Sequence, residues 1–263
     1  MRYFFFDKSV SAGETIIIKS SNFHHIRNVL RLNIGDIIGL LDGRGNSSTA
    51  QIDSFEFDGV KAQILYCKRT PDRAAMKLII AQAFLKDKKM DDLVRQMTEL
   101  GTTVWIPFCS ERSVSRPDSH RLRRRLERWD KISHESLKQC RRGRALDIEP
   151  AASFKDVMLR AQSCDLRILF WEDEIGPIDF SKMTSGGNQI KQICAILGPE
   201  GGFSTTEVDI ARAHGFVTVG LGPRILRTQT ATVAAAAILQ YLYGDMGKKS
   251  LTKRGTFNRR ENS

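Results

Sequence analysis

Short apolar runs alternate with helical segments through most of this chain after residue 76, and this alternation restricts the fold more than any other feature. Each run is too short for a helix, and the stretches between the runs carry helical periodicity. Strands that alternate with helices predict an α/β fold with a mostly parallel sheet, covered by helices on both faces. The expected strands are residues 77–84, 103–108, 166–171, 190–197 and 216–221.

Helix starts and one unusual helix can be recognised in the same region. A serine followed three residues later by an acid predicts a capping box at the start of a helix. The two boxes are Ser153 with Asp156 and Ser204 with Glu207. The last expected helix, residues 230–243, has almost no polar side chains in its alanine-rich centre. Such a helix must be enclosed, either by its own domain or by a second subunit.

The first seventy residues show a different pattern, in which short strands are separated by turn sequences of the Asp-Gly type. The expected strands are residues 3–6, 15–18, 36–41, 49–55 and 60–67. They predict a small β-barrel that one helical piece, residues 22–30, interrupts. We therefore divide the chain into a barrel domain (1–72), an α/β domain (73–247) and a basic tail (248–263) that we expect to be disordered.

The chain is strongly basic, with a net charge of +11 from 41 Lys and Arg against 30 Asp and Glu. Such an excess is typical of proteins that bind a polyanion, most often nucleic acid; a basic but otherwise ordinary enzyme is the alternative. Residues 121–144 hold ten Lys and Arg against three acids. Apolar residues there follow a helical stripe, so the cations would project from a helix and contact phosphates. The alternative is a solvated helix face.

Cysteine and histidine patterns give no metal site. The five cysteines are odd in number and form no CxxC pair that could hold zinc. His24 and His25 would point away from each other on a helix. We find no secretory signal, and no apolar stretch approaches the ~18 residues needed to cross a membrane. We expect a cytoplasmic protein whose cysteines are small, buried apolar residues.

Two glycine-containing loops, residues 197–203 and 220–228, each follow an expected strand and precede an expected helix. Ligands of open parallel sheets bind beyond the carboxyl ends of the strands, so two loops on one edge would line one pocket. Neither loop matches the GxGxxG or GxxxxGK[ST] fingerprint of nucleotide sites. The alternative is a pair of tight turns, with Arg224 and Arg227 simply solvated. We interpret the run Glu172-Asp173-Glu174 as a solvated loop without a catalytic role.

Five motifs resemble, in order and spacing, the RsmE family of bacterial enzymes, which methylate N3 of a uridine in small-subunit ribosomal RNA. They are HHIRNVLRLNIGD, LKDKKMDDLVRQMTELG, RSV at residues 112–114, LGPEGGFSTTE and LGPRILRTQTA. The resemblance covers about residues 1–245. It implies a SPOUT-class methyltransferase domain with a deep trefoil knot and an N-terminal PUA-like barrel for RNA. It also implies a homodimer that buries the alanine-rich helix.

The resemblance further implies that S-adenosylmethionine binds in the knot, against the backbone of the two loops. The matching positions in the first loop are Leu197, Gly198, Glu200, Gly201 and Gly202. Those in the second loop are Leu221, Gly222, Ile225, Leu226 and Arg227. The implied partners are 16S ribosomal RNA in the small subunit and a second copy of the chain.

Methyl transfer to uracil N3 requires the weakly acidic imide to lose its proton, so we expect the protein to orient the base and stabilise its anion. Arg227 is the first candidate for this role, followed by Arg31 and Arg112. Glu200 is a candidate proton acceptor, with a backbone-only role for its loop as the alternative. N3 lies on the Watson–Crick edge, so the target must be unpaired or flipped out. RNA contacts are expected from Arg27, Arg31, Arg123, Arg124, Arg128 and Arg141.

Two positions depart from the pattern of the family. Gln229 stands where the family usually has Glu, and Gln96 stands where Lys is common. A Gln at either position still donates and accepts hydrogen bonds, so we expect fold and cofactor to be retained. The departures motivate a second hypothesis, a noncatalytic RNA-binding protein with this fold. A third is a SPOUT enzyme that acts on transfer RNA.

Overall fold

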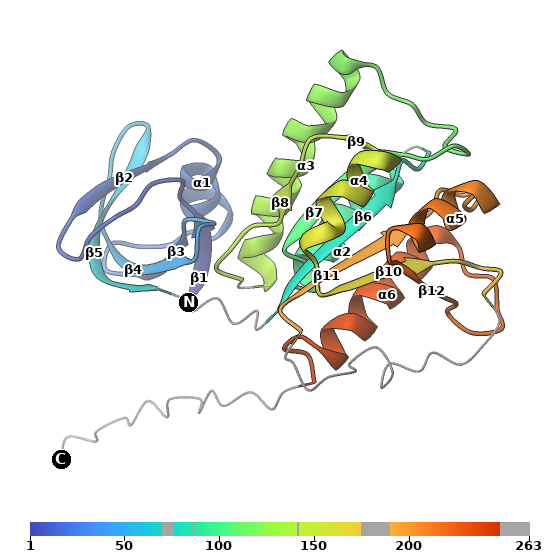
Figure 1. Cartoon of the computed structure of the whole chain (residues 1–263). Helices are drawn as coiled ribbons and strands as arrows, with labels where there is room; N and C mark the ends of the chain where they lie inside the picture. The colour runs from blue at the N-terminus through green and yellow to red at the C-terminus, as the bar shows by residue number, and fades with distance from the viewer. Residues whose placement is uncertain (70–75, 87, 141, 175–189, 248–263) are drawn as a thin grey trace.

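The structure is a computed structural model that describes residues 1–69, 76–86, 88–140, 142–174 and 190–247. It contains two sheets, one in each half of the chain (Figure 1). The predicted boundary at residues 72–73 and the predicted disordered tail lie outside the described residues.

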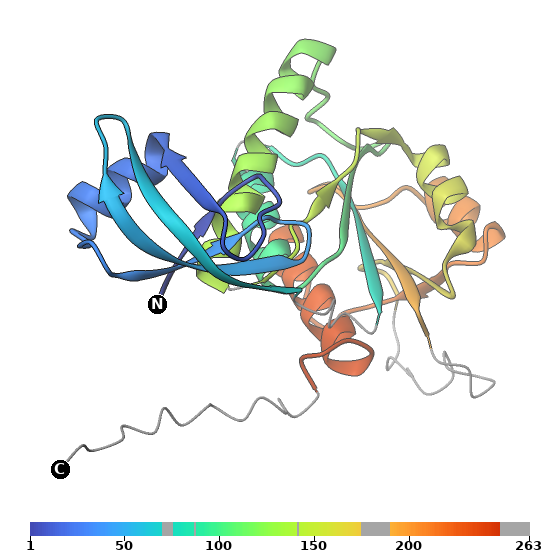
Figure 2. The ribbon, with the colours of Figure 1, turned by 90° about the vertical axis from the view of Figure 1, so that its left-hand side faces the viewer.

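The N-terminal sheet has five strands and is strongly curled, as Figure 2 shows. The strands are β1 (Arg2–Phe5), β2 (Thr15–Lys19), β3 (Ile37–Leu41), β4 (Asn46–Phe55) and β5 (Gly59–Arg69). Their order is β1-β3-β4-β5-β2, and only the β1–β3 pair is parallel. All five predicted strands are confirmed. Alternate strand residues fill the inside of the curl, which buries side chains such as Phe4, Ile38 and Ile52.

The expected helix over 22–30 takes a different form. A short helix α1 (Ser20–His24) continues into a π-helical turn η1 (His25–Val29), closed by a hydrogen bond from Leu30 N to His25 O. The wider turn changes the angle between successive side chains, so the residues do not share the single apolar face of a regular helix. Ile26 is buried, but Val29, three positions later, is 60% exposed.

The second sheet is parallel throughout its described pairs, in the order β12-β10-β11-β6-β7-β8, with β9 also beside β7. Its strands are β6 (Lys77–Ala83), β7 (Val104–Cys109), β8 (Asp147–Ile148), β9 (Ala152–Ser153), β10 (Leu166–Phe170), β11 (Gln192–Leu197) and β12 (Val217–Val219). The predicted parallel α/β fold is confirmed. The trefoil knot is not tested by these pairings and stays a prediction.

Helices cover both faces of this sheet because successive strand residues point to opposite sides. One face packs against α2 (Lys89–Glu99), α3 (Ser119–Cys140) and α6 (Thr228–Leu242). The other face packs against α4 (Phe154–Arg160), the short 3-10 turn η2 (Ala161–Ser163) and α5 (Thr205–Ala213). Both predicted capping boxes are present, at the starts of α4 and α5.

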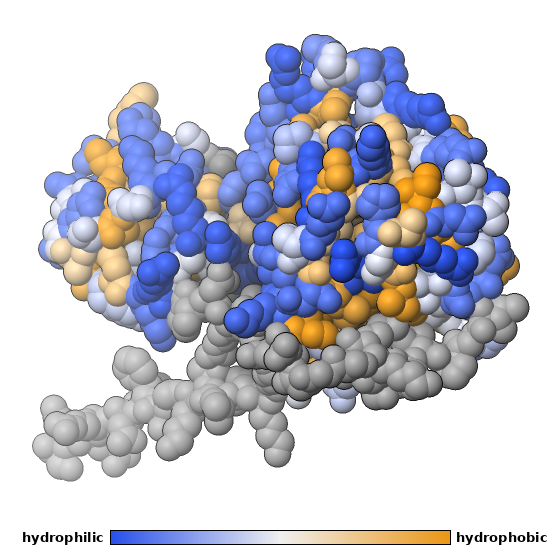
Figure 3. Space-filling view, in the orientation of Figure 1, coloured by the Kyte–Doolittle hydropathy of each residue, from blue (hydrophilic) through white to orange (hydrophobic). Residues whose placement is uncertain are grey.

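The alanine-rich helix α6 is largely enclosed by its own domain. It packs on α2, β6 and β11, and it buries Ala235, Ala236 and Leu239. Its C-terminal end and the turn that follows it are different, because Tyr241, Leu242 and Met246 are exposed. Figure 3 shows hydrophobic residues along the lower edge of the larger lobe, on the side where Figure 1 places α6. The end of α6 and the following turn therefore expose apolar side chains.

The two halves of the chain meet at α3, which lies between them in Figures 1 and 2. Gly45 N donates to Gly143 O, and Ala145 N donates to Gly43 O, each at 2.9 Å. The rings of Phe5 and His134 add a contact with centroids 4.2 Å apart. The N-terminal sheet is thus joined to the second domain by backbone pairing as well as by side chains. No helix in the described ranges is long and apolar enough to cross a membrane.

The cysteines are less uniformly buried than expected. Cys164 and Cys194 are buried, but Cys67 is exposed on β5, where it donates to Val10 O. Cys67 lies near the end of a long strand whose outer positions face solvent, which explains this difference.

Candidate functional site

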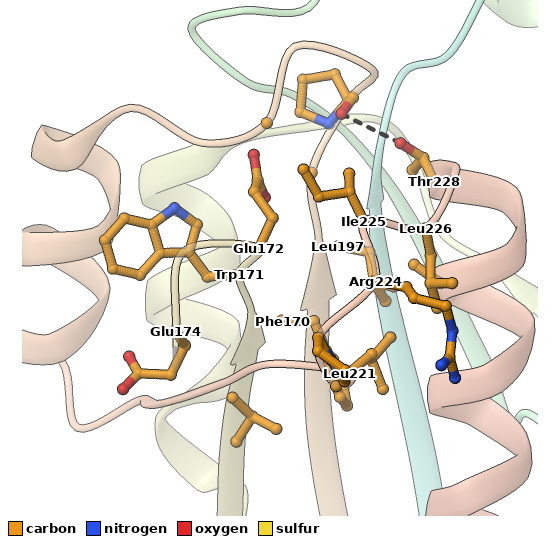
Figure 4. Close-up of a pocket in the computed structure, with 17 residues that line it drawn as sticks. Phe170, Trp171, Glu172, Glu174, Leu197, Leu221, Arg224, Ile225, Leu226 and Thr228 are labelled. Carbon is orange, nitrogen blue, oxygen red and sulfur yellow. Dashed lines mark hydrogen bonds between the residues drawn. The ribbon is translucent and has the colours of Figure 1, made fainter. Parts of the chain in front are cut away.

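Three loops at the carboxyl ends of β10, β11 and β12 line one cavity of about 530 Å³ (Figure 4). These strands are parallel neighbours in the sheet, so their carboxyl ends lie on one edge. The loop after β11 contributes Gly198 and Gly202, and the loop after β12 contributes Gly222 and Ile225. The two glycine-containing loops therefore share a cavity, as the sequence indicated.

The loop after β10 supplies Trp171, Glu172 and Glu174, which the sequence patterns did not identify as part of a site. Figure 4 shows them on one side of the cavity, with Leu221, Ile225 and Leu226 on the other. A carboxylate-containing run after a strand has no distinctive spacing, and only the strand order places it beside the two glycine loops. These carboxylates give the apolar cavity a negative side.

A small network holds Trp171 and Glu174 in place. Glu174 accepts hydrogen bonds from Thr218 Oγ1 and from Arg212 Nη2. The Arg212 guanidinium also lies 5.4 Å from the centre of the Trp171 ring, within cation–π distance. Arg212 thus neutralises Glu174, whereas Glu172 makes no ion pair among the described residues.

Two features favour glycine at position 202. Its φ of +67° lies in the left-handed region that side chains disfavour. In addition, a Cβ at this position would displace the carboxylate at the end of the flexible Glu172 side chain. Gly222 has a similar φ of +91°, but a Cβ there would meet open space. The space beside Gly202 is thus filled by the Glu172 carboxylate, whereas the exposed backbone at Gly222 borders the cavity directly.

A buried polar chain ties the cavity floor to α6. Gln82, fully buried in β6, donates from Nε2 to Gly198 O at 3.0 Å. Its Oε1 accepts from Thr232 Oγ1 at 2.6 Å, and Thr228 Oγ1 donates to Pro199 O at 3.2 Å. Buried polar groups need such partners, so these bonds fix the first glycine loop against α6. A single Gln inside an apolar run gave no sign of this role in the sequence.

A second network connects the first glycine loop with the loop that carries Arg112. The buried Glu207 carboxylate accepts from Ser110 Oγ at 3.1 Å and from Glu111 N at 2.9 Å. Arg112, on the same loop, connects it to the first glycine loop, because its Nη1 donates to Gly201 O at 3.2 Å. The capping box of α5 therefore also positions the arginine of the RSV motif.

A second cavity of about 380 Å³ lies beside the first and shares Ile225, Leu226 and Thr228 with it. Lys89 and Glu200 also line it and form an ion pair, with Nζ and Oε1 2.9 Å apart. The backbone N–H of Lys86 donates to the same oxygen at 3.1 Å. Partial burial raises the pKa of Glu200, but the hydrogen bonds from Lys89 and Lys86 outweigh it and leave that pKa below its usual range.

Comparisons with known proteins agree with this geometry. Residues 72–240 match the model of an RNA methyltransferase domain, and residues 18–65 match that of an RNA methyltransferase PUA domain. A Bacillus subtilis protein, Ribosomal RNA small subunit methyltransferase E, is 31% identical over 237 residues, which span 89% of this chain and 93% of the relative. The chain belongs to the RsmE family. The Synechocystis RsmE is 30% identical over 85% of this chain and 72% of its own length.

A solved RsmE from Neisseria gonorrhoeae, bound to S-adenosyl methionine, has a TM-score of 0.82 and 28% identity. The match covers 94% of this chain and 99% of that one. The two sheets described above therefore form the fold of an RsmE methyltransferase with its PUA domain.

The structure divides the positions that match the RsmE cofactor motifs between the two cavities. The first cavity is lined by Leu197, Gly198, Gly202, Leu221, Gly222, Ile225 and Leu226. Glu200 and Arg227 line the second cavity instead. Gly201 lines neither, and its carbonyl faces Arg112. Arg227 precedes α6 as its N-cap residue and is exposed.

The arginines expected to bind RNA lie in several places. Arg27 and Arg31 are exposed in the N-terminal domain and line neither cavity, so Arg31 is not brought to the site. The Arg27 guanidinium lies 5.7 Å from the Phe23 ring and 5.8 Å from the Phe55 ring. Arg31 has a φ of +51° just after the π-helical turn.

The arginines of α3 differ in their partners. Arg123 and Arg124 are exposed and make no ion pair among the described residues. Arg128 projects too, but its Nη2 lies 2.8 Å from Asp91 Oδ2 on α2. Asp91 also accepts from the indole of the buried Trp129 at 2.8 Å. Arg141 lies outside the described residues.

Proposed function

We propose that this protein transfers a methyl group from S-adenosylmethionine to N3 of a uridine in 16S ribosomal RNA, as a cytoplasmic homodimer acting on the small subunit. The observation that carries the proposal is the shared cavity of the glycine loops in a chain of the RsmE family. A second, cation-containing cavity beside it provides room for the acceptor base.

The first cavity fits the chemistry of the cofactor. S-adenosylmethionine supplies an electrophilic methyl group on a positively charged sulfonium. The Glu172 carboxylate, which makes no ion pair in the part of the chain that the structure describes, suits a cationic ligand, and apolar walls from Leu197 and Leu221 suit its purine. Gly222, where a Cβ would meet open space, lets the backbone approach a ligand without side-chain obstruction. The volume of about 530 Å³ is typical of a small-molecule site.

The residues around the acceptor base act by orientation and charge. Arg227 lines the second cavity, next to the wall that both cavities share, and can stabilise the uracil anion. Arg112 steadies the first glycine loop through Gly201 O and so acts by positioning. Glu200 stays ionised because Lys89 and Lys86 hydrogen-bond to it, so it is a weak proton acceptor. We assign Arg31 to RNA binding, together with Arg27, Arg123, Arg124, Arg128 and Arg141.

The dimer proposal rests on the exposed apolar end of α6, where Tyr241, Leu242 and Met246 gather. Tyr241→Asp should reduce the molar mass measured by light scattering from that of two chains to that of one. A wild-type protein that is monomeric at micromolar concentration would contradict the dimer.

The activity is tested with small subunits purified from a strain that lacks the endogenous enzyme. Incubation with the protein and methyl-labelled S-adenosylmethionine should produce 3-methyluridine, identified by mass spectrometry of nucleosides. Base-resolved mapping of the product then gives the nucleotide. Label in transfer RNA instead, or no label together with no heat of cofactor binding in calorimetry, would overturn the proposal.

A further inference from the structure

The second cavity has an unusual wall. Ile225, which lines both cavities, is 87% exposed, although it is a large apolar residue. Thr228 and Leu226 complete the shared boundary. An exposed isoleucine at such a boundary offers an apolar contact to a planar ligand that enters the cavity. Because the two cavities share this wall, a ligand in the second cavity would lie next to the first cavity.

The charges of the second cavity favour an anion. Lys89 and Arg227 contribute two cations, whereas Glu200 is the one carboxylate among its lining residues. Gln229 also lines it and adds no charge. The ion pair with Glu200 fixes Lys89 Nζ at 2.9 Å from the carboxylate, yet a lysine ammonium has further protons to donate.

The geometry of uracil limits where a protein can place groups that stabilise the N3 anion. N3 has one position in the plane of the ring, and the departing proton and the incoming methyl group both need it. A side-chain base seated there would block the donor. Stabilisation of the anion must therefore come from donors to the flanking O2 and O4 atoms, which share the negative charge.

On the basis of the proposed function, we propose that the second cavity holds the target uracil and that Lys89 is a catalytic residue, donating a hydrogen bond to a carbonyl oxygen of the uracil anion. Glu200 is a positioning residue that holds the ammonium of Lys89. The N3 proton leaves to solvent as the base ionises. The N3 lone pair then bonds to the methyl carbon as the carbon–sulfur bond breaks. The sulfonium becomes a neutral thioether, the uracil becomes neutral, and Lys89 keeps its protons.

Lys89→Met tests the assignment, with the exposed neighbour Lys88→Met as the matched control. Single-turnover rates are measured on small subunits between pH 6 and 10. Removal of one donor to a developing oxyanion typically costs about 100-fold or more, so Lys89→Met should lose about that much near neutrality. The loss of rate should shrink as the pH rises, because the N3 of the target uracil then loses its proton without help from Lys89. Lys88→Met should match wild type, and Lys89→Arg should recover most of the rate.

A substrate with a more acidic N3 separates catalysis from folding and binding. Subunits are reconstituted with 16S RNA in which 5-fluorouridine replaces uridine, and both substrates are compared. The ratio of the wild-type rate to the Lys89→Met rate should be at least about 10-fold smaller on the fluorinated RNA. The fluorine atom stabilises the N3 anion, so the anion depends less on a hydrogen bond from Lys89. Calorimetry with S-adenosylmethionine and filter binding of RNA should show affinities within about twofold of wild type.

The outcomes are distinct. If wild-type protein makes no 3-methyluridine, the proposed function fails. If wild type is active but Lys89→Met is equally fast, or its deficit is the same on both RNAs and at all pH values, the role of Lys89 is rejected. A deficit explained by weaker RNA binding rejects it as well. Glu200→Gln should slow the reaction less than Lys89→Met; an equal loss would contradict a positioning role.

Discussion

Thr232 and Gln82, 150 residues apart in the chain, form a buried hydrogen bond of 2.6 Å between Oγ1 and Oε1. The Gln82 amide also donates to Gly198 O, so this bond connects α6 to the first glycine loop. Neither residue lines the first cavity, so the pair supports the loop from outside.

Thr232→Val removes the donor while keeping the shape of the side chain. Gln82 Oε1 is then buried without a partner, which typically costs about 1–3 kcal/mol. Urea denaturation should show this loss in the free energy of unfolding, and calorimetry should show weaker S-adenosylmethionine binding. The control Thr206→Val, at an exposed position of α5, should change stability by less than about 0.5 kcal/mol. Equal changes in the free energy of unfolding for the two variants would show that the buried hydrogen bond does not stabilise the fold.

Gly202→Ala and Gly222→Ala form a matched pair. Both place a side chain at positive φ, which costs about 1–2 kcal/mol. Only Gly202→Ala also displaces the Glu172 carboxylate. We therefore expect Gly202→Ala to weaken cofactor binding in calorimetry about 10-fold more than Gly222→Ala. Comparable losses would mean that Glu172 does not contribute to the cofactor site.

Arg124→Ala and Arg128→Ala should differ, although both arginines project from α3. Arg124 makes no ion pair in the described ranges of the chain, so its removal should weaken RNA binding and reduce the salt slope by about one. Arg128 forms an ion pair with Asp91, so its removal should change the salt slope of RNA binding less than the removal of Arg124. Filter binding at several salt concentrations gives both slopes. An unchanged slope for Arg124→Ala would contradict phosphate contact by α3.

The Lys89–Glu200 pair predicts a dependence of stability on acid. The pKa of Glu200 is lower in the folded protein than its usual value, so the carboxylate stabilises the fold above about pH 4 and loses this effect as the pH falls through the folded pKa. The pair is partly exposed, so the contribution stays below about 1 kcal/mol. Thermal unfolding of wild type and Glu200→Gln should differ at pH 7 and converge near pH 3. A constant difference would contradict the pairing.

The sequence predicted the parallel sheet, both capping boxes and the shared cavity of the glycine loops, because these depend on local periodicity and on the common edge of parallel strands. It missed Trp171, Glu172 and Glu174, which follow β10. Their position depends on β10 lying between β11 and β12, and strand order is not encoded in any local pattern.

Long-range contacts and one local π-helical turn explain the other features that the sequence did not predict. Gln82 is a lone polar residue in an apolar strand, and its partners in the first glycine loop and in α6, Gly198 and Thr232, lie more than a hundred positions away. Arg128 resembles its neighbours in the basic run, and only the packing of α3 on α2 brings Asp91 beside it. The π-helical turn at His25 breaks a periodicity that a regular helix would have kept.

The backbone pairing of Gly43 and Gly45 with Ala145 and Gly143 joins the curled sheet to the segment that follows α3. It therefore links the cations near the π-helical turn to those along α3. If both groups of cations bind RNA as proposed, we expect an RNA whose folded outline matches their spacing to bind more tightly than an unfolded strand of the same sequence.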